Sequence, residues 1–118
     1  MPNDYLIGTG IYDVTGPAAE LGMMGMASID QKTEGIHSRL FARAFIVCDQ
    51  NFNKRVVILS ADIWSCTLAV KMEVVKRLKS LFGNDLYSID NVLLSGTHTH
   101  SGPGGYSHYA LFNLSILR

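Results

Sequence analysis

Apolar positions along the chain fall into short runs separated by polar turns, and the first runs have the composition of β-strands. Residues 5–12 form a short apolar segment that contains two glycines, and this pattern predicts a strand. Residues 40–48 and 55–63 are rich in Val, Ile and Phe, with the polar stretch 49–54 between them. Two such runs joined by a short polar turn predict a β-hairpin.

After the hairpin the apolar spacing changes to that of a helix. Between residues 67 and 82, apolar side chains recur every three or four positions and basic side chains fill the other side, which predicts an amphipathic helix that ends at Gly83. The apolar run 91–96 predicts a buried strand, and residues 109–117 predict another helix. Residues 16–39 are rich in glycine and lack a regular apolar period, so we expect a long irregular connection there.

The order of these elements favours an α/β fold, with a mixed layered sheet and flanking helices, over a helix bundle. With 118 residues, the chain holds one domain at most. A sheet of three or four strands with one full helix leaves one of its faces poorly covered. Exposed apolar surface of this kind usually awaits another part of the protein, so we expect residues 1–118 to belong to a larger domain.

Charge and hydropathy exclude several functional classes. Ten basic and ten acidic residues cancel, and neither sign forms a run that would attract nucleic acid or an anionic membrane. The apolar fraction of 47% is ordinary for a globular domain, and no apolar stretch approaches the roughly 20 residues that a transmembrane segment needs. The first residues lack the pattern of a signal peptide. Cys48 and Cys66 fit two reduced thiols better than a disulfide.

The richest candidate chemistry is the segment THTHSGPGG at residues 97–105, directly after the last predicted strand. If this segment is extended, the rings of His98 and His100 point to the same face, about 6.6 Å apart along the strand. Neutral imidazole is a good zinc ligand, but a catalytic zinc ion normally has about three protein ligands and an open position for water. A bare pair of histidines is more often structural. The glycines that follow form a tight turn that can expose N–H groups as an anion-binding nest.

Three segments taken together resemble the N-terminal part of the neutral ceramidases: THTHSGPGG, ELGMMGMASIDQKTEGIHSRLFARAF and YSHYALFNLS. The motifs GMMG, GIHSR and THTHSGPGG occur in the family's order, and the similarity runs over almost the whole chain. The resemblance implies that residues 1–118 are the N-terminal segment of a zinc hydrolase domain that is several times longer. The implied reaction is hydrolysis of the amide bond of ceramide, N-acylsphingosine, to sphingosine and a fatty acid. The implied location is extracellular, either secreted or membrane-associated.

The resemblance also implies roles for individual residues. His98 matches the zinc ligand, and His100 lies beside the metal, where it contacts the substrate and acts on the developing tetrahedral centre. A further histidine, a glutamate and a tyrosine from later in the family's sequence complete the site, so this chain alone is expected to be inactive. Gly25 is expected to contact the substrate, because a backbone without a side chain can approach a polar headgroup. The main-chain carbonyl of His37 is expected to help bind a structural cation, calcium or magnesium.

Two alternative interpretations stay open, one of the histidine pair and one of the whole chain. In the first, His98 and His100 jointly bind one metal ion, as such pairs do in amidohydrolase-type barrels. In the second, the chain is a truncated, non-catalytic module that contacts lipid through exposed Met and Tyr side chains. Ser101 is not expected to act as a nucleophile, since it lacks the Gly-x-Ser-x-Gly elbow. Asp62, at the end of a predicted strand, is expected to cap the next turn, with orientation of a histidine as the alternative.

Overall fold

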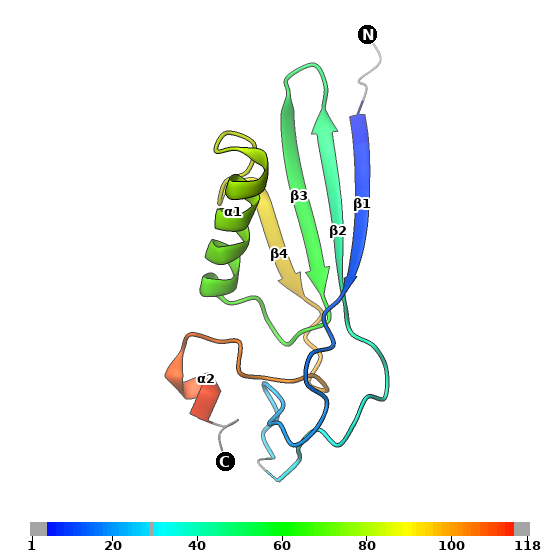
Figure 1. Ribbon diagram of the computed structural model, residues 1–118, viewed down its shortest axis with the longest axis vertical. Helices are drawn as coiled ribbons and strands as arrows, with labels where there is room; N and C mark the ends of the chain where they lie inside the picture. The colour runs from blue at the N-terminus through cyan, green and yellow to red at the C-terminus, as the bar shows by residue number, and fades with distance from the viewer. Residues whose placement is uncertain (1–4, 29, 115–118) are drawn as a thin grey trace.

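The computed structural model describes residues 5–28 and 30–114, and its centre is one mixed four-stranded sheet (Figure 1). The strands lie in the order of the sequence: β1 (Tyr5–Asp13), β2 (Phe41–Asp49), β3 (Lys54–Ala61) and β4 (Val92–Gly96). β1, β2 and β3 pair antiparallel, whereas β3 and β4 pair parallel. The predicted α/β class with a mixed sheet is therefore confirmed.

The hairpin between β2 and β3 closes where the sequence predicts it. Asp49 at the end of β2 pairs with Lys54 at the start of β3, and its side chain accepts hydrogen bonds from the backbone N–H groups of Asn51 and Phe52. Asn53 takes a left-handed backbone conformation, with φ of 49°, which asparagine tolerates better than most residues. These turn contacts set the register of the two strands.

The parallel pairing of β3 and β4 requires a crossover connection, and helix α1 (Leu68–Phe82) supplies it. The hydroxyl of Thr67 accepts a hydrogen bond from the N–H of Val70 and so caps the first turn. At the other end, Gly83 has φ of 93° and donates its N–H to the carbonyl of Lys79, which is a C-cap conformation that glycine adopts at low cost. The predicted helix and its stop are both confirmed.

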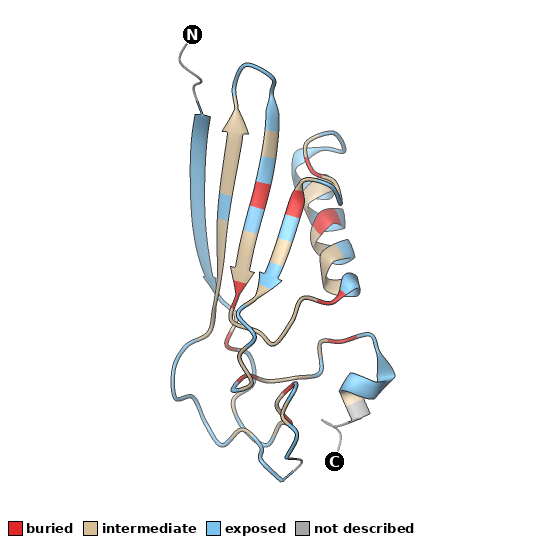
Figure 2. Cartoon of the chain, turned by 180° about the vertical axis from the view of Figure 1, so that it is seen from behind, coloured by how far each residue is buried: buried red, intermediate tan, exposed pale blue. Residues whose placement is uncertain are grey.

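The hydrophobic core lies between α1 and the β3–β4 half of the sheet, as the buried residues in Figure 2 show. Val57 from β3, Val92 from β4, Val75 from α1 and Tyr87 from the connection to β4 form its buried centre. The core is small because one helix covers only part of one face of the sheet. Burial of these side chains supplies the hydrophobic stabilisation that holds the helix on the sheet.

The opposite face of the sheet is apolar and uncovered. Strand side chains alternate between faces, and the register places seven exposed large apolar residues on the side that α1 does not cover. They are Tyr5, Ile7, Ile11, Phe45, Val56, Ile58 and Leu93. We call this set the open sheet face. The predicted shortage of cover on one face is thus found in the structure.

The other elements also follow the predicted ranges closely. The described residues of the stretch 16–39 form the expected irregular connection, held locally by a backbone bridge between Gly22 and Lys32. The last helix, α2, spans Ala110–Leu114, while residues 115–117 of the predicted helix lie outside the described part of the chain. Among the described helices, none is both long and apolar enough to cross a bilayer.

The long loops gather at one end of the sheet, at the lower end of the molecule in Figure 1. The connection from β1 to β2, the segment between β3 and α1, and the segment after β4 all meet there. For β3 and β4 this is the carboxyl end, which is where open sheets with parallel strands usually bind ligands. The predicted site residues all lie in these loops.

Candidate active site

The two histidines of the THTH segment lie in a turn, so the expected extended geometry is wrong. β4 ends at Gly96, and His98 has a left-handed backbone with φ of 66°, a conformation that usually costs a residue other than glycine about 1 kcal/mol. The turn nevertheless brings the rings of His98 and His100 together. Their centroids are 4.9 Å apart and the ring planes are nearly perpendicular, at 82°. His98 is exposed and His100 is half-buried.

The ring of His98 is held by Trp64, from the segment that follows β3. Nδ1 of His98 lies 3.1 Å from the main-chain carbonyl oxygen of Trp64, and the indole lies against the imidazole with ring centroids 5.6 Å apart. A carbonyl only accepts hydrogen bonds, so this contact places the proton on Nδ1 and leaves the lone pair of Nε2 free. Metal-binding histidines commonly use this arrangement, in which the second ring nitrogen donates to a carbonyl.

Gly25 lies directly beside these rings. It has φ of 81°, and a Cβ atom at this position would be 2.4 Å from Nε1 of Trp64 and 2.9 Å from Cε1 of His100. Only glycine fits both the backbone conformation and the space. Because its backbone is exposed next to His100, the predicted contact between Gly25 and substrate agrees with its position and stays a prediction.

The glycine-rich segments around Gly25 and after His100 pack on each other. The N–H of Gly104 donates to the carbonyl of Gly22 at 3.1 Å, and Met23 forms a backbone bridge with Pro103. The anion-binding nest expected after His100 is therefore not fully available, since the Gly104 amide is already bonded. Met24 is buried, with 1% of its surface exposed, so its side chain is enclosed by the protein and offers no surface to a lipid.

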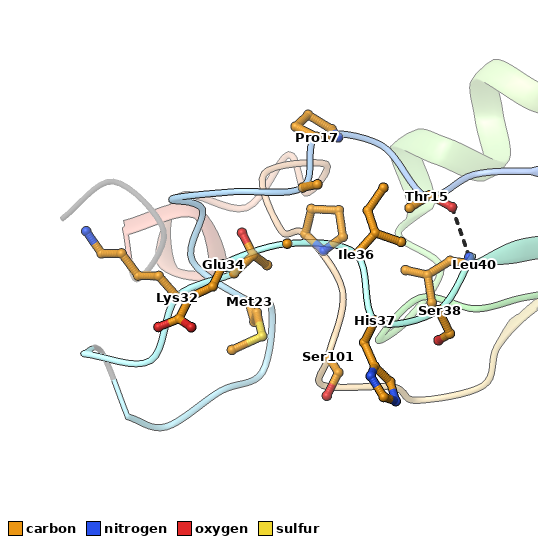
Figure 3. A pocket seen from close by; sticks show the side chains of 14 residues that line it. Thr15, Pro17, Met23, Lys32, Glu34, Ile36, His37, Ser38, Leu40 and Ser101 are labelled. Carbon is orange, nitrogen blue, oxygen red and sulfur yellow. Dashed lines mark hydrogen bonds between the residues drawn. The ribbon is translucent and has the colours of Figure 1, made fainter.

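His37 lies apart from His98 and His100. It lines an open pocket of about 540 Å³ together with residues of the 15–40 connection and with Ser101 and Pro103 (Figure 3). The rings of His98 and His100 do not line this pocket. The expected role of the His37 carbonyl in holding a structural cation stays a prediction.

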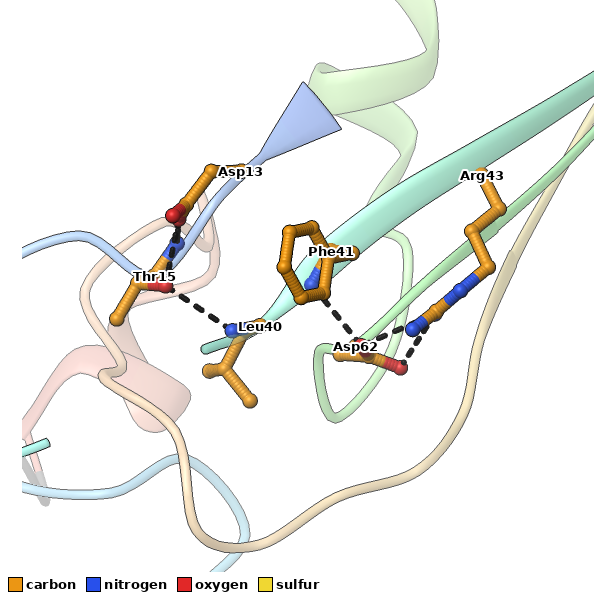
Figure 4. Close-up of polar contacts among 6 residues, drawn as sticks. All are labelled: Asp13, Thr15, Leu40, Phe41, Arg43 and Asp62. Carbon is orange, nitrogen blue, oxygen red and sulfur yellow. Dashed lines mark hydrogen bonds and ion pairs between the residues drawn. The ribbon is translucent and has the colours of Figure 1, made fainter. Parts of the chain in front are cut away.

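Asp62 performs neither of the roles expected from the sequence. Its carboxylate accepts a hydrogen bond from the N–H of Phe41 and two from the guanidinium of Arg43, at 3.0 and 3.1 Å (Figure 4). Thr97, the residue before His98, also donates its hydroxyl to this carboxylate. The Phe41 N–H is the main cause that holds the pKa of Asp62 below its usual range, with Arg43 and Thr97 adding to it. Asp62 thus joins β2 to the start of the histidine turn.

The side chains near His98 could supply part of a zinc site. Within the described residues, no group of three or more His, Cys, Asp and Glu side chains is placed to hold a metal ion. His98, with Nε2 free, suits zinc as one ligand, which agrees with the expectation that the chain carries only part of a site. Cys48 and Cys66 are free, not bridged, and burial raises the pKa of the Cys66 thiol, which disfavours its thiolate form as a ligand.

Trp64 is the site residue that sequence reasoning missed. It is the single tryptophan of the chain and follows the β3 strand closely, at the carboxyl end where sites are common. Those two facts were available in the sequence. Its contact with His98 was not, because the two residues are 34 positions apart and meet only through the parallel pairing of β3 and β4.

Comparison with known proteins identifies relatives across nearly the whole chain. Residues 5–118 match the family model described as "Neutral/alkaline non-lysosomal ceramidase, N-terminal". The chain is 53% identical over 115 residues to neutral ceramidase A of Dictyostelium discoideum, covering 98% of this chain and 16% of the relative. It is 47% identical over 115 residues to neutral ceramidase 3 of Arabidopsis thaliana, covering 98% and 15%.

A solved structure matches the fold. The crystal structure of neutral ceramidase from Pseudomonas aeruginosa superposes with a TM-score of 0.92 at 47% sequence identity, covering 99% of this chain and 18% of that one. The chain therefore spans less than a fifth of the length of these relatives.

Proposed function

Because the chain belongs to the neutral/alkaline non-lysosomal ceramidase family, we propose that it contributes part of the site at which ceramide is hydrolysed to sphingosine and a fatty acid. Zinc is the proposed cofactor, with His98 as one of its ligands. The remaining ligands come from polypeptide beyond the 118 residues described by this sequence. The remainder of the enzyme and the ceramide substrate are the proposed partners.

The observation that carries this proposal is the contact between His98 Nδ1 and the Trp64 carbonyl. It gives the imidazole the tautomer that a zinc ligand needs, and it fixes the direction of the Nε2 lone pair. A surface histidine with no such role gains little from a strained backbone conformation. Backbone strain at one residue of a loop at the end of a sheet often marks a functional position.

Zinc, when bound, would lower the pKa of a water ligand and polarise the amide carbonyl of the substrate. His98 would hold the ion. His100 would lie within reach of the substrate because its ring packs edge to face on that of His98. Amide hydrolysis needs a proton for the departing amine, and His100 is proposed to deliver it to the sphingosine nitrogen.

Gly25 gives the substrate access to this pair. Its exposed backbone stands against Trp64 and His100 without a side chain in between. The indole of Trp64 and the ring of His100 fill the space that a Cβ would occupy, so a polar headgroup would reach Gly25 from its exposed side, next to His100. This placement supports the proposed contact between Gly25 and ceramide.

The test uses the complete polypeptide and a fluorescent ceramide. His98→Ala should abolish bound zinc and lower kcat by at least 1,000-fold, on the order of what loss of metal-assisted catalysis removes. His108→Ala is the matched control, because His108 is an exposed histidine whose ring stacks on Tyr109. Full zinc content and activity in the His98 variant would refute the proposal.

A further inference from the structure

The backbone on either side of His98 lies along the segment that follows β3. The N–H of Thr97 donates to the carbonyl of Ala61 at 2.9 Å, and the N–H of His98 donates to that of Ile63 at 3.1 Å. Gly96 makes this approach possible, since a Cβ there would be 2.7 Å from the Ile63 carbonyl oxygen and 3.0 Å from that of Trp64. The position of His98 therefore depends on where the backbone of residues 61–65 lies.

Both the main-chain carbonyl and the indole of Trp64 contact the ring of His98. The Trp64 carbonyl accepts from Nδ1 of His98, so a movement of that carbonyl rotates the ring or breaks the contact. The indole of Trp64 is packed between His98 and Phe112, with centroid distances of 5.6 and 5.2 Å. The ring of His98 is thus oriented by both the main chain and the side chain of one residue.

Tyr106 contacts the same backbone segment through the segment's N–H groups. Its hydroxyl oxygen accepts a hydrogen bond from the N–H of Ser65 at 3.4 Å, and the N–H of Trp64 also interacts with it. Tyr106 comes from the segment after the glycine-rich turn and is half-buried. It lines a hollow of about 200 Å³ together with Trp64 and Asp62. One phenol therefore reaches the peptide group that contains the Trp64 carbonyl, through the N–H of Ser65, and the peptide group before it, through the N–H of Trp64.

We infer that Tyr106 is a positioning residue for the metal site: its hydroxyl fixes the Trp64–Ser65 backbone, and that backbone sets the orientation and tautomer of His98. Tyr106 does not touch the ion or the substrate in this arrangement. Its contribution is to the affinity for zinc. The inference rests on the proposed function, because it takes His98 as a zinc ligand.

Tyr106→Phe in the complete enzyme tests this, because it removes one hydroxyl and keeps the ring. Loss of partners that orient a ligand typically weakens metal affinity by 10- to 100-fold, and we expect a zinc dissociation constant about 10-fold higher, measured by chelator competition. Saturating zinc should restore most of kcat. Tyr109→Phe, at an exposed tyrosine three residues away, is the matched control and should leave zinc affinity unchanged.

A second variant displaces the same backbone, at Ile63 and Trp64, by a substitution at Gly96. Gly96→Ala places a methyl group against the carbonyls of Ile63 and Trp64, and it should also weaken zinc binding. If Tyr106→Phe fails to fold, an unchanged zinc affinity in Gly96→Ala would refute the step from this backbone to His98, on which the role of Tyr106 depends. The tautomer of His98 in the metal-free enzyme, read from its ¹⁵N chemical shifts, should move from protonated Nδ1 towards a mixture in either variant.

The outcomes separate this inference from the proposal that it rests on. If His98→Ala abolishes zinc binding and Tyr106→Phe leaves the affinity and tautomer unchanged, the positioning role of Tyr106 is refuted while the zinc site stands. If His98→Ala leaves zinc bound, both fail. A loss of kcat in Tyr106→Phe that saturating zinc does not restore would also contradict the positioning role.

Discussion

The imidazole rings of His98 and His100 pack edge to face at a centroid distance of 4.9 Å, although the backbone between them is a turn and not an extended strand. The left-handed conformation of His98 produces this contact. It places one ring against Trp64 and the other against Gly25. The two histidines thus have different surroundings, and different roles are expected for them.

Substitution of His100 distinguishes a catalytic histidine from a second zinc ligand. In the complete enzyme, His100→Ala should retain zinc and lower kcat by about 100-fold or more, as loss of a general acid does. Metal content by mass spectrometry and turnover of ceramide are the two measurements. Loss of zinc together with activity would instead support joint ligation by both histidines, as in amidohydrolase-type sites.

Gly25→Ala should damage the site through packing. The new methyl group would meet the indole of Trp64 and the ring of His100, in a backbone conformation with φ of 81°. We expect a loss of about 1–3 kcal/mol in stability and a clear drop in kcat. Gly35→Ala is the matched control, because a Cβ at Gly35 meets no atom within 4 Å. Normal turnover and melting temperature in Gly25→Ala would contradict the described packing.

The lowered pKa of Asp62 predicts that the protein loses stability in acid. The folded pKa of its carboxyl is lowered, first by the Phe41 N–H and then by Arg43 and Thr97. A lowered folded pKa means that this stabilisation is fully present above the unfolded pKa of about 3.9 and is lost as pH falls through the lower folded value. The melting temperature of wild type should therefore fall more steeply below about pH 4 than that of Asp62→Asn. Asp85→Asn, at an exposed carboxylate, should keep the wild-type slope.

The open sheet face predicts the behaviour of residues 1–118 expressed alone. Seven exposed large apolar side chains on one face exceed what a stable monomer usually presents. The isolated chain should bind a hydrophobic dye, self-associate in sedimentation experiments and hydrolyse no ceramide. Exchange of Ile7 and Ile11 for threonine should reduce the association. A monomeric, dye-free wild-type chain would contradict the description of this face, and turnover by it would contradict a partial site.

Most of the fold could be predicted from local sequence patterns. Alternating and clustered apolar residues located the strands, and Thr67 and Gly83 mark the ends of α1 because capping is a local interaction. Strand order and the parallel pairing of β4 depend on distant contacts, so the sequence indicated only a mixed sheet. The conformation of His98 escaped prediction for the same reason. Its strain is stabilised by Trp64 and Ile63, far away along the chain.

The candidate site could be predicted only in part. His98, His100 and Gly25 were identified from their motifs, and the structure brings these three together. His37, which the resemblance assigns to a separate structural cation, lines a pocket that the rings of His98 and His100 do not line, and its role stays a prediction. Trp64, Tyr106 and the role of Asp62 depend on contacts made by backbone atoms. Such contacts have no side-chain signature in a single sequence.

An anomalous difference map collected at the zinc absorption edge, from crystals of the complete enzyme, would show directly whether His98 is a zinc ligand. If His98 binds zinc, a zinc peak will lie about 2.0–2.1 Å from Nε2 of His98, with Nδ1 still bonded to the Trp64 carbonyl. A zinc peak elsewhere, with His98 uninvolved, would contradict this role.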